Sequence, residues 1–240
     1  MNATRTFTPP AILAVEIEQF ENAVEMTREC RYVNVNFQDD YYFGSIFNSG
    51  VNTLLATHSE VGKGFTVLDV GYGNGTFLRE VAARYPSAHK IGMAAVSRDE
   101  FNDAVIITGD IARADTWESS AGTLPEPGSV DVAVSHLTFM HLANPINGLA
   151  NVLRLIKPSG RLYIDHLRLS ADPADFDVLE NTLHEVLAGH VKYPNISFKD
   201  YAGQGEVALD FPVFTEGLDS VNLDVFKPYV NERGEVCFTI

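Results

Sequence analysis

An apolar strand pattern followed by a glycine-rich turn constrains the fold of this chain most strongly. The stretch reads FTVLDVGYGNGT over residues 65–76, and its apolar half predicts a buried parallel strand. Apolar residues then return at helical spacing through residue 85. Strand, glycine turn and helix is the layout of a nucleotide-binding unit: glycine lets a ligand approach the backbone, and the helix start favours an anionic group.

Further strand and helix patterns alternate along the chain. Helical spacing is found at 11–30, 45–58, 76–85, 146–156 and 176–188, and strand-like runs at 65–70, 90–95, 105–108, 130–135 and 161–165. Residues 220–229 and 235–240 flank a turn and predict an antiparallel hairpin. The order predicts an α/β fold with a doubly wound, mostly parallel seven-stranded sheet and a C-terminal antiparallel hairpin.

The same pass along the chain suggests how it is organised. We expect an N-terminal helical cap over residues 1–60 and a Rossmann-like domain over 61–240, with a loop-rich cover insertion at 190–219. Tyr41, Tyr42 and Phe43 either close over a ligand or fasten the N-terminal helices to the sheet, and the sequence leaves both interpretations open.

Composition narrows the classes of partner. The net charge of −15 argues against binding nucleic acid phosphates and against anionic membranes, and favours a neutral or cationic small molecule. A homodimer or a protein partner is compatible with it. Cys30 and Cys237 form no metal-ligand spacing, so we expect neither a metal nor a disulfide framework. Without a signal-peptide pattern or a long apolar run, the expected compartment is the cytoplasm.

The glycine turn, preceded by Leu68 and Asp69, resembles motif I of the class I S-adenosylmethionine methyltransferases. Residues 124–145 and 151–164 are similar to the fourth and fifth strand regions of the ubiquinone/menaquinone type, so the resemblance spans about residues 64–166. It implies a class I methyltransferase fold, S-adenosyl-L-methionine as cofactor and methyl transfer to a small molecule on O, N or C. The cofactor-binding residues that we predict are Asp69, Gly71, Tyr72, Gly73, Asn74, Gly75, Asp110, Ile111 and Ser135.

Two departures from the family pattern lie on the side expected to hold the ribose and adenine. Ala94 stands where the family carries an acid that accepts bonds from both ribose hydroxyls. The crossover over residues 96–104 is also short for a parallel connection. Asp99 or Glu100 could take over the role of the missing acid. Alternatively, the chain is a non-methylating member of the same fold that serves as a binding or regulatory partner or uses its pocket for another reaction.

Histidines at the predicted strand ends are the candidate bases. Ligands in open α/β sheets sit outside the carboxyl ends of the strands, where His136 and His166 follow the fourth and fifth strands. His141 lies about one helical turn beyond His136. Imidazole titrates near neutrality, so each of the three is a candidate to take a proton from the methyl acceptor.

Overall fold

The computed structural model describes residues 10–29, 48–60, 64–97, 103–171, 175–192, 195–201, 204–210, 213–214 and 221–240. Its helices are α1 (Pro10–Glu29), α2 (Asn48–Glu60), α3 (Thr76–Arg84), α4 (Pro145–Leu155) and α5 (Phe176–Leu187), with short 3₁₀ turns η2 (Ala114–Thr116) and η3 (Phe139–His141). Each of the five α-helices covers a segment with predicted helical spacing. No described helix is both long enough and apolar enough to cross a membrane.

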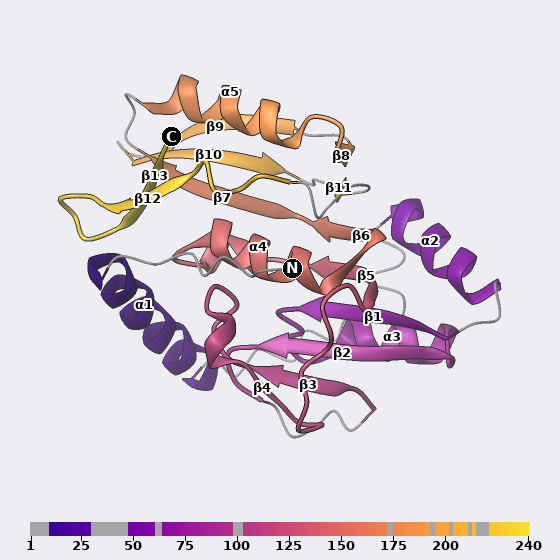
Figure 1. Cartoon of the computed structure of the whole chain (residues 1–240). Helices are drawn as coiled ribbons and strands as arrows, with labels where there is room; N and C mark the ends of the chain where they lie inside the picture. The colour runs from indigo at the N-terminus through magenta and orange to yellow at the C-terminus, as the bar shows by residue number, and fades with distance from the viewer. Residues whose placement is uncertain are drawn as a thin grey trace.

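The main sheet has the strand order β4-β3-β2-β1-β5-β6-β11-β8 among the described residues (Figure 1). Its strands are β1 (Phe65–Val70), β2 (Ala88–Ala94), β3 (Val105–Thr108), β4 (Glu118–Ser119), β5 (Val130–Ser135), β6 (Ile156–Ile164), β8 (Val191–Lys192) and β11 (Val213–Phe214). The five strands from β3 to β6 run parallel, and the short edge strands are antiparallel. The predicted doubly wound, mostly parallel sheet is confirmed, with eight strands in place of seven.

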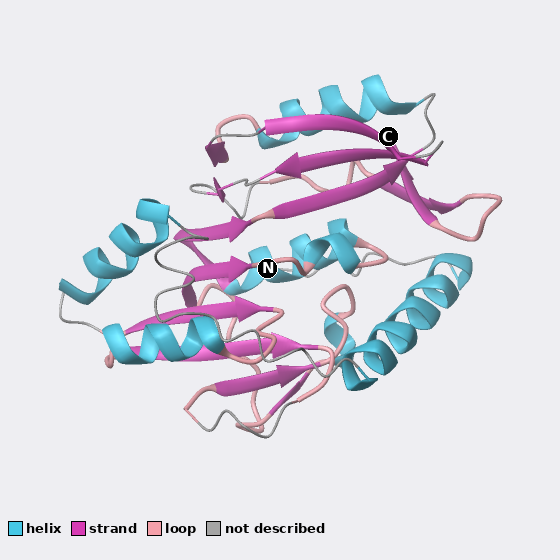
Figure 2. Ribbon diagram, turned by 180° about the vertical axis from the view of Figure 1, so that it is seen from behind, coloured by secondary structure: helices cyan, strands magenta, loops and turns pink. Residues whose placement is uncertain are grey.

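Helices cover both faces of this sheet (Figure 2), and alternating side chains of the central strands pack against them. Leu68 and Val70 point into a core that they share with α1, α4 and α5. Phe65 and Val67 point to the other face, where they meet α2 and α3. A strand buried on both faces is mostly apolar, as the sequence pattern at β1 predicted, and Asp69 is the charged exception near its end.

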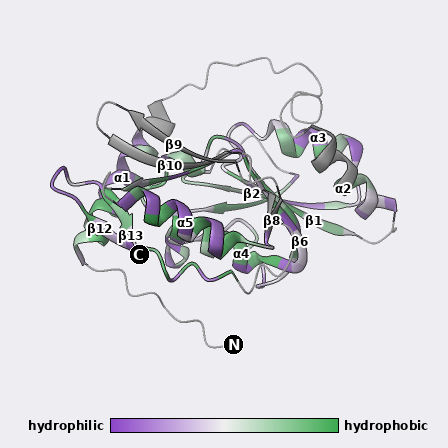
Figure 3. Ribbon diagram, turned by 90° about the horizontal axis from the view of Figure 1, so that it is seen from above, coloured by the Kyte–Doolittle hydropathy of each residue, from purple (hydrophilic) through white to green (hydrophobic). Residues whose placement is uncertain are grey.

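The chain leaves the main sheet at Asp165. Residues beyond it form a second, antiparallel sheet in the order β7-β10-β9, from β7 (His166–Ala171), β9 (Asn195–Tyr201) and β10 (Gln204–Asp210). The expectation that residues 190–219 are loop-rich is therefore wrong, because strands occupy most of the described part of that segment. Helix α5 alternates hydrophilic and hydrophobic residues along its length (Figure 3), which fits a helix with one buried face.

The predicted C-terminal hairpin is present as β12 (Lys227–Val230) and β13 (Val236–Thr239). It forms a two-stranded sheet of its own, whereas the strand beside β6 in the main sheet is β11. Buried Phe238 and Val236 join the core that also contains residues of β7 and α1. The hairpin therefore closes this core and does not extend the main sheet.

Candidate active site

The turn between β1 and α3 is built from glycines in a left-handed conformation. Gly71, Gly73 and Gly75 have φ values of 81°, 52° and 76°, which side chains rarely adopt. The Gly71 N–H donates to the Met93 carbonyl at the end of β2, 2.7 Å away. A Cβ on Gly73 would have nothing nearer than the Gly71 carbonyl oxygen at 3.9 Å, so the space beside Gly73 is open.

Gly71 is required for a different reason. A Cβ there would lie 1.8 Å from Oγ1 of Thr138, a residue of the loop that follows β5. The loop therefore packs directly on the glycine turn. This contact brings the end of β5 and the start of α3 together at one edge of the sheet, and the close approach at Gly71 is to protein.

Asn74 and Tyr72 have structural contacts. The Asn74 carboxamide oxygen accepts from the Thr76 N–H (3.1 Å) and the Thr76 hydroxyl (2.6 Å), and so caps the start of α3. The ring of Tyr72 covers Gly92 on β2 so closely that a Cβ on Gly92 would lie 2.9 Å from it. Tyr72 is buried in the core on that face. Cofactor contacts by these two side chains stay predictions.

Two buried carboxylates lie at the carboxyl ends of β1 and β3. Asp69 is 6% exposed, and burial raises its pKa from 3.8 to about 8. Asp110 is 5% exposed, and one of its oxygens accepts from the Ala112 N–H at 2.9 Å. Burial also raises the pKa of Asp110, while the Ala112 bond and the Arg113 guanidinium oppose that rise. A cation or a hydrogen-bond donor would stabilise the ionised form of either group.

Two other predicted cofactor residues are buried. The Ile111 side chain lies in the core, and its carbonyl accepts from the Asn151 carboxamide at 3.1 Å. Ser135, the last residue of β5, is fully buried, and its hydroxyl finds no hydrogen-bond partner among the described residues. Contact of either side chain with a ligand stays a prediction.

The loop after β5 brings two predicted bases to one carboxylate. Nδ1 of His136 lies 2.6 Å from Oδ2 of Asp165, close enough to need a proton between the two atoms, although the ring N–H is not well aligned for a hydrogen bond. Both Asp165 oxygens also accept from the Leu137 N–H at 2.9 Å. Leu137 has a φ of 52°, unusual outside glycine, so the loop is held in a strained conformation.

His141 lies on η3 near the same carboxylate. Much of its side chain is exposed, but its ring sits in a partly desolvated position. This desolvation and the nearby Arg168 guanidinium lower the His141 pKa, and Asp165 opposes them. A lowered pKa keeps the imidazole neutral, which is the form that accepts a proton. His166 begins β7, and its side chain lies outside the described residues.

Ala94 is the last residue of β2 and lies beside Thr108 of β3. The end of β2 is where the sequence pattern of the family carries an acid, and Ala94 supplies no carboxylate at that position. Asp99 and Glu100, the proposed substitutes, lie outside the described residues, as do Tyr41, Tyr42 and Phe43. Sequence reasoning placed Asp165 at the end of the strand predicted over residues 161–165 but gave it no role, and it missed one buried acid near the site, Glu16. Glu16 lies within an ordinary amphipathic pattern, which does not mark it as unusual.

The model of a methyltransferase domain family matches residues 41–199. The chain belongs to this methyltransferase family. The match confirms the predicted class I methyltransferase-like core, and S-adenosylmethionine is the cofactor that goes with it.

Individual relatives are distant. A 37.1 kDa protein from a Streptomyces fradiae transposon, whose function is uncharacterised, is 33% identical over 120 residues, 48% of this chain and 34% of that protein. The chain thus spans about a third of the length of this relative. Among solved structures, a Burkholderia thailandensis 1,6-didemethyltoxoflavin N1-methyltransferase is 15% identical, with a TM-score of 0.43 and coverage of 90% of this chain and 94% of that one. An arsenic(III) S-adenosylmethionine methyltransferase from Chlamydomonas reinhardtii is 16% identical, with a TM-score of 0.41 and coverage of 69% and 73%. Scores this low carry no argument about substrate.

The residues of this member of the methyltransferase family fit the cofactor in most respects. The open space beside Gly73 admits a group against the backbone, and ionised Asp69 suits a ligand with cationic groups. Asp110 offers an acceptor at the end of β3. The exception is Ala94, which supplies no acceptor for ribose hydroxyls. The fit is therefore good around the glycine turn, and the sequence position expected to bind ribose is bare.

Proposed function

We propose that this protein transfers a methyl group from S-adenosylmethionine to a small, neutral or cationic acceptor. The observation that carries the proposal is the glycine turn at the carboxyl edge of the sheet. Three glycines with positive φ form the turn, and the backbone beside Gly73 is open to a ligand. Asp69 is buried in β1, two residues before the turn. The net charge of −15 supports an uncharged or cationic acceptor over a nucleic acid.

The chain's own residues divide the work between binding and proton transfer. The turn at residues 71–75 would hold the methionine end of the cofactor, Asp69 would balance its positive charge, and Asp110 would accept from the adenine amino group. When bound, S-adenosylmethionine supplies an electrophilic methyl group on its sulfonium. Alignment of donor and acceptor in a desolvated pocket accounts for much of the acceleration in such a displacement.

His136 is the residue we assign to the acceptor proton. The Asp165 contact at Nδ1 would fix the ring and its tautomer, leaving Nε2 as the proton acceptor. The His136 side chain is 20% exposed, so it can meet a substrate while Asp165, 5% exposed, stays behind it. A base is needed only when the acceptor loses a proton, so this role applies to hydroxyl, amine or acidic carbon acceptors.

Ala94 favours a second candidate function. A member of the fold without a ribose-binding acid could keep the pocket for a partner or for another reaction. This alternative predicts little or no affinity for S-adenosylmethionine. Binding therefore separates the two candidates before any acceptor is known.

The test is to replace Gly73 by Val and measure binding of S-adenosylhomocysteine, the demethylated product, by calorimetry. The Val side chain would fill the open space and abolish binding. Gly122→Val is the matched control, because Gly122 also has a positive φ (76°) and has nothing within 4 Å of its Cβ position. It should share the backbone strain and leave binding unchanged. Equal affinities in wild type and Gly73→Val would contradict the placement of the cofactor.

A further inference from the structure

Glu16 is a buried carboxylate that the fold brings to the ligand edge from outside the core domain. It lies on α1 and is 1% exposed. Helix α1 runs beside the edge of the main sheet toward which β1 and β2 point (Figure 1). Burying an acid is costly unless its oxygens find partners, so the contacts of Glu16 call for an explanation.

One oxygen of Glu16 is tied down firmly. Its Oε1 accepts from the Asn144 carboxamide nitrogen at 2.8 Å. The Asn144 oxygen accepts from the Asn147 N–H at 3.0 Å and caps α4, which fixes the direction of the amide. Asn144 is itself fully buried. Glu16 is therefore held in one position between α1 and the start of α4.

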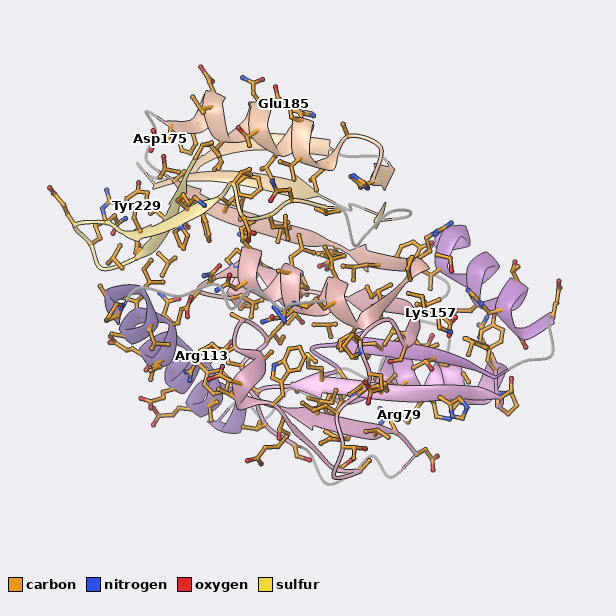
Figure 4. The ribbon with its side chains drawn as sticks, viewed as in Figure 1. Arg79, Arg113, Lys157, Asp175, Glu185 and Tyr229 are labelled. Atoms are coloured by element: carbon orange, nitrogen blue, oxygen red, sulfur yellow. The ribbon has the colours of Figure 1, made fainter. Side chains whose placement is uncertain are left out.

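The other oxygen of Glu16, Oε2, is buried, and within the part of the chain that the structure describes it accepts no hydrogen bond and forms no ion pair. Asp110 is close enough for its charge to raise the pKa of Glu16, and burial is the larger cause of that rise. Arg113, labelled beside α1 in Figure 4, acts in the opposite direction, and Asp115 adds to the rise. Contacts of α4 place Glu16 in the same region: one turn beyond Asn144, a Cβ on Gly148 would lie 3.5 Å from Cγ2 of Ile111, the residue after Asp110.

This part of the site adjoins the end of β2, which carries no acidic side chain. Ala94 is the register partner of Thr108, and the Gly109 N–H donates to the Ala94 carbonyl at 3.1 Å. Asp110 comes next along the chain. Glu16, bonded to the residue that caps α4, is therefore near the end of β3, next to the strand end where the sequence comparison expects a ribose-binding acid.

We propose that Glu16 is a ligand-binding residue whose carboxylate accepts hydrogen bonds from the donors of the cofactor's nucleoside end. This inference rests on the proposed function and extends it. A purely structural tie to Asn144 needs only an acceptor, which a glutamine would supply without a buried charge. An ionisable group with a free oxygen is explained by a ligand that brings hydroxyl or amino donors.

The experiment compares S-adenosylhomocysteine, adenosine and methionine binding to wild type and Glu16→Gln. Glutamine keeps the bond from Asn144 and replaces the orphan acceptor by an amide donor. We expect the dissociation constants of S-adenosylhomocysteine and adenosine to rise about 10-fold or more, since a hydrogen bond to an ionised acceptor is lost. Methionine binding should not change. Glu18→Gln, the same substitution at an exposed site on α1, is the control and should match wild type.

Two further measurements keep the inference open to refutation if Glu16→Gln folds poorly. Glu16→Ala should show the same pattern with a larger loss, and wild type should bind 2′,3′-dideoxyadenosine and inosine more weakly than adenosine. Unchanged adenosine binding in folded Glu16 variants would overturn the assignment and leave Glu16 as a structural link. If wild type binds no form of the cofactor, the proposed function itself fails.

Discussion

At the scale of single residues, burial governs the acids at the carboxyl edge. Asp69, Asp110 and Glu16 are each more than nine-tenths buried, and burial is the largest cause of the raised pKa in all three. A folded protein that keeps such groups out of water loses stability when they ionise. A ligand that brings positive charge or donors to this edge recovers part of that loss.

Asp69 gives a direct prediction for stability against pH. Its pKa is about 8 in the folded state and 3.8 in the unfolded state, so the native protein holds the extra proton between these values. The free energy of unfolding should therefore fall as pH rises from 5 to 8, by up to roughly 4 kcal/mol from this group. Asp69→Asn should flatten the fall. Denaturation of both proteins at pH 5, 6.5 and 8 measures it, and parallel curves would show that Asp69 is not buried as described.

His136 and Asp165 give a prediction for turnover. His136→Asn should lower the rate about 10²-fold or more and leave cofactor affinity intact, in line with the usual contribution of a general base. Asp165→Asn should also lower the rate, because the ring loses its anionic partner 2.6 Å from Nδ1. Rates between pH 5.5 and 9, with S-adenosylmethionine affinity measured in parallel, test both variants. An unchanged pH profile in His136→Asn would reduce that residue to a structural role.

At the scale of elements, the strands with the strongest apolar patterns were predicted most accurately. The apolar runs at β1, β3 and β5 gave their positions almost without error, because strands buried on both faces are mostly apolar. Strands β8 and β11 have two residues each, too few for any period to show. The strand predicted over residues 161–165 ends at the observed break, but β7, which pairs with β10, was not predicted because polar residues interrupt its apolar pattern.

The start of α4 carries a prediction at this scale. Asn144→Ala should destabilise the protein by roughly 2–4 kcal/mol, because it removes a helix cap and leaves buried Glu16 Oε1 without its donor. Asn144→Ser keeps a side-chain oxygen that can cap α4 and removes the carboxamide that donates to Glu16. Urea denaturation of the two variants separates these contributions. A loss of less than about 0.5 kcal/mol in both would mean that α1 is not anchored through this contact.

At the scale of the whole molecule, the sequence predicted the class of fold, and it placed the candidate binding residues at one edge of the sheet. From the sequence, the glycine turn, Asp69, Asp110 and His136 were named as candidate site residues, because the carboxyl ends of parallel strands meet at one edge of a sheet. The position of α1 could not be predicted from the sequence, because helical spacing shows which face of a helix is buried but not which element that face packs against. Glu16 meets Asn144 across 128 residues of chain, so only the fold brings it to the start of α4.

The measurement that tests the central claim most directly is a calorimetric titration of the full chain with S-adenosylmethionine. We predict saturable binding at one site, and release of protons near pH 7, because a cationic ligand favours ionised Asp69. Repeating the titration in two buffers with different ionisation enthalpies reveals the proton release. Absence of saturable heat at millimolar S-adenosylmethionine and S-adenosylhomocysteine would contradict the claim that this edge of the sheet binds the cofactor.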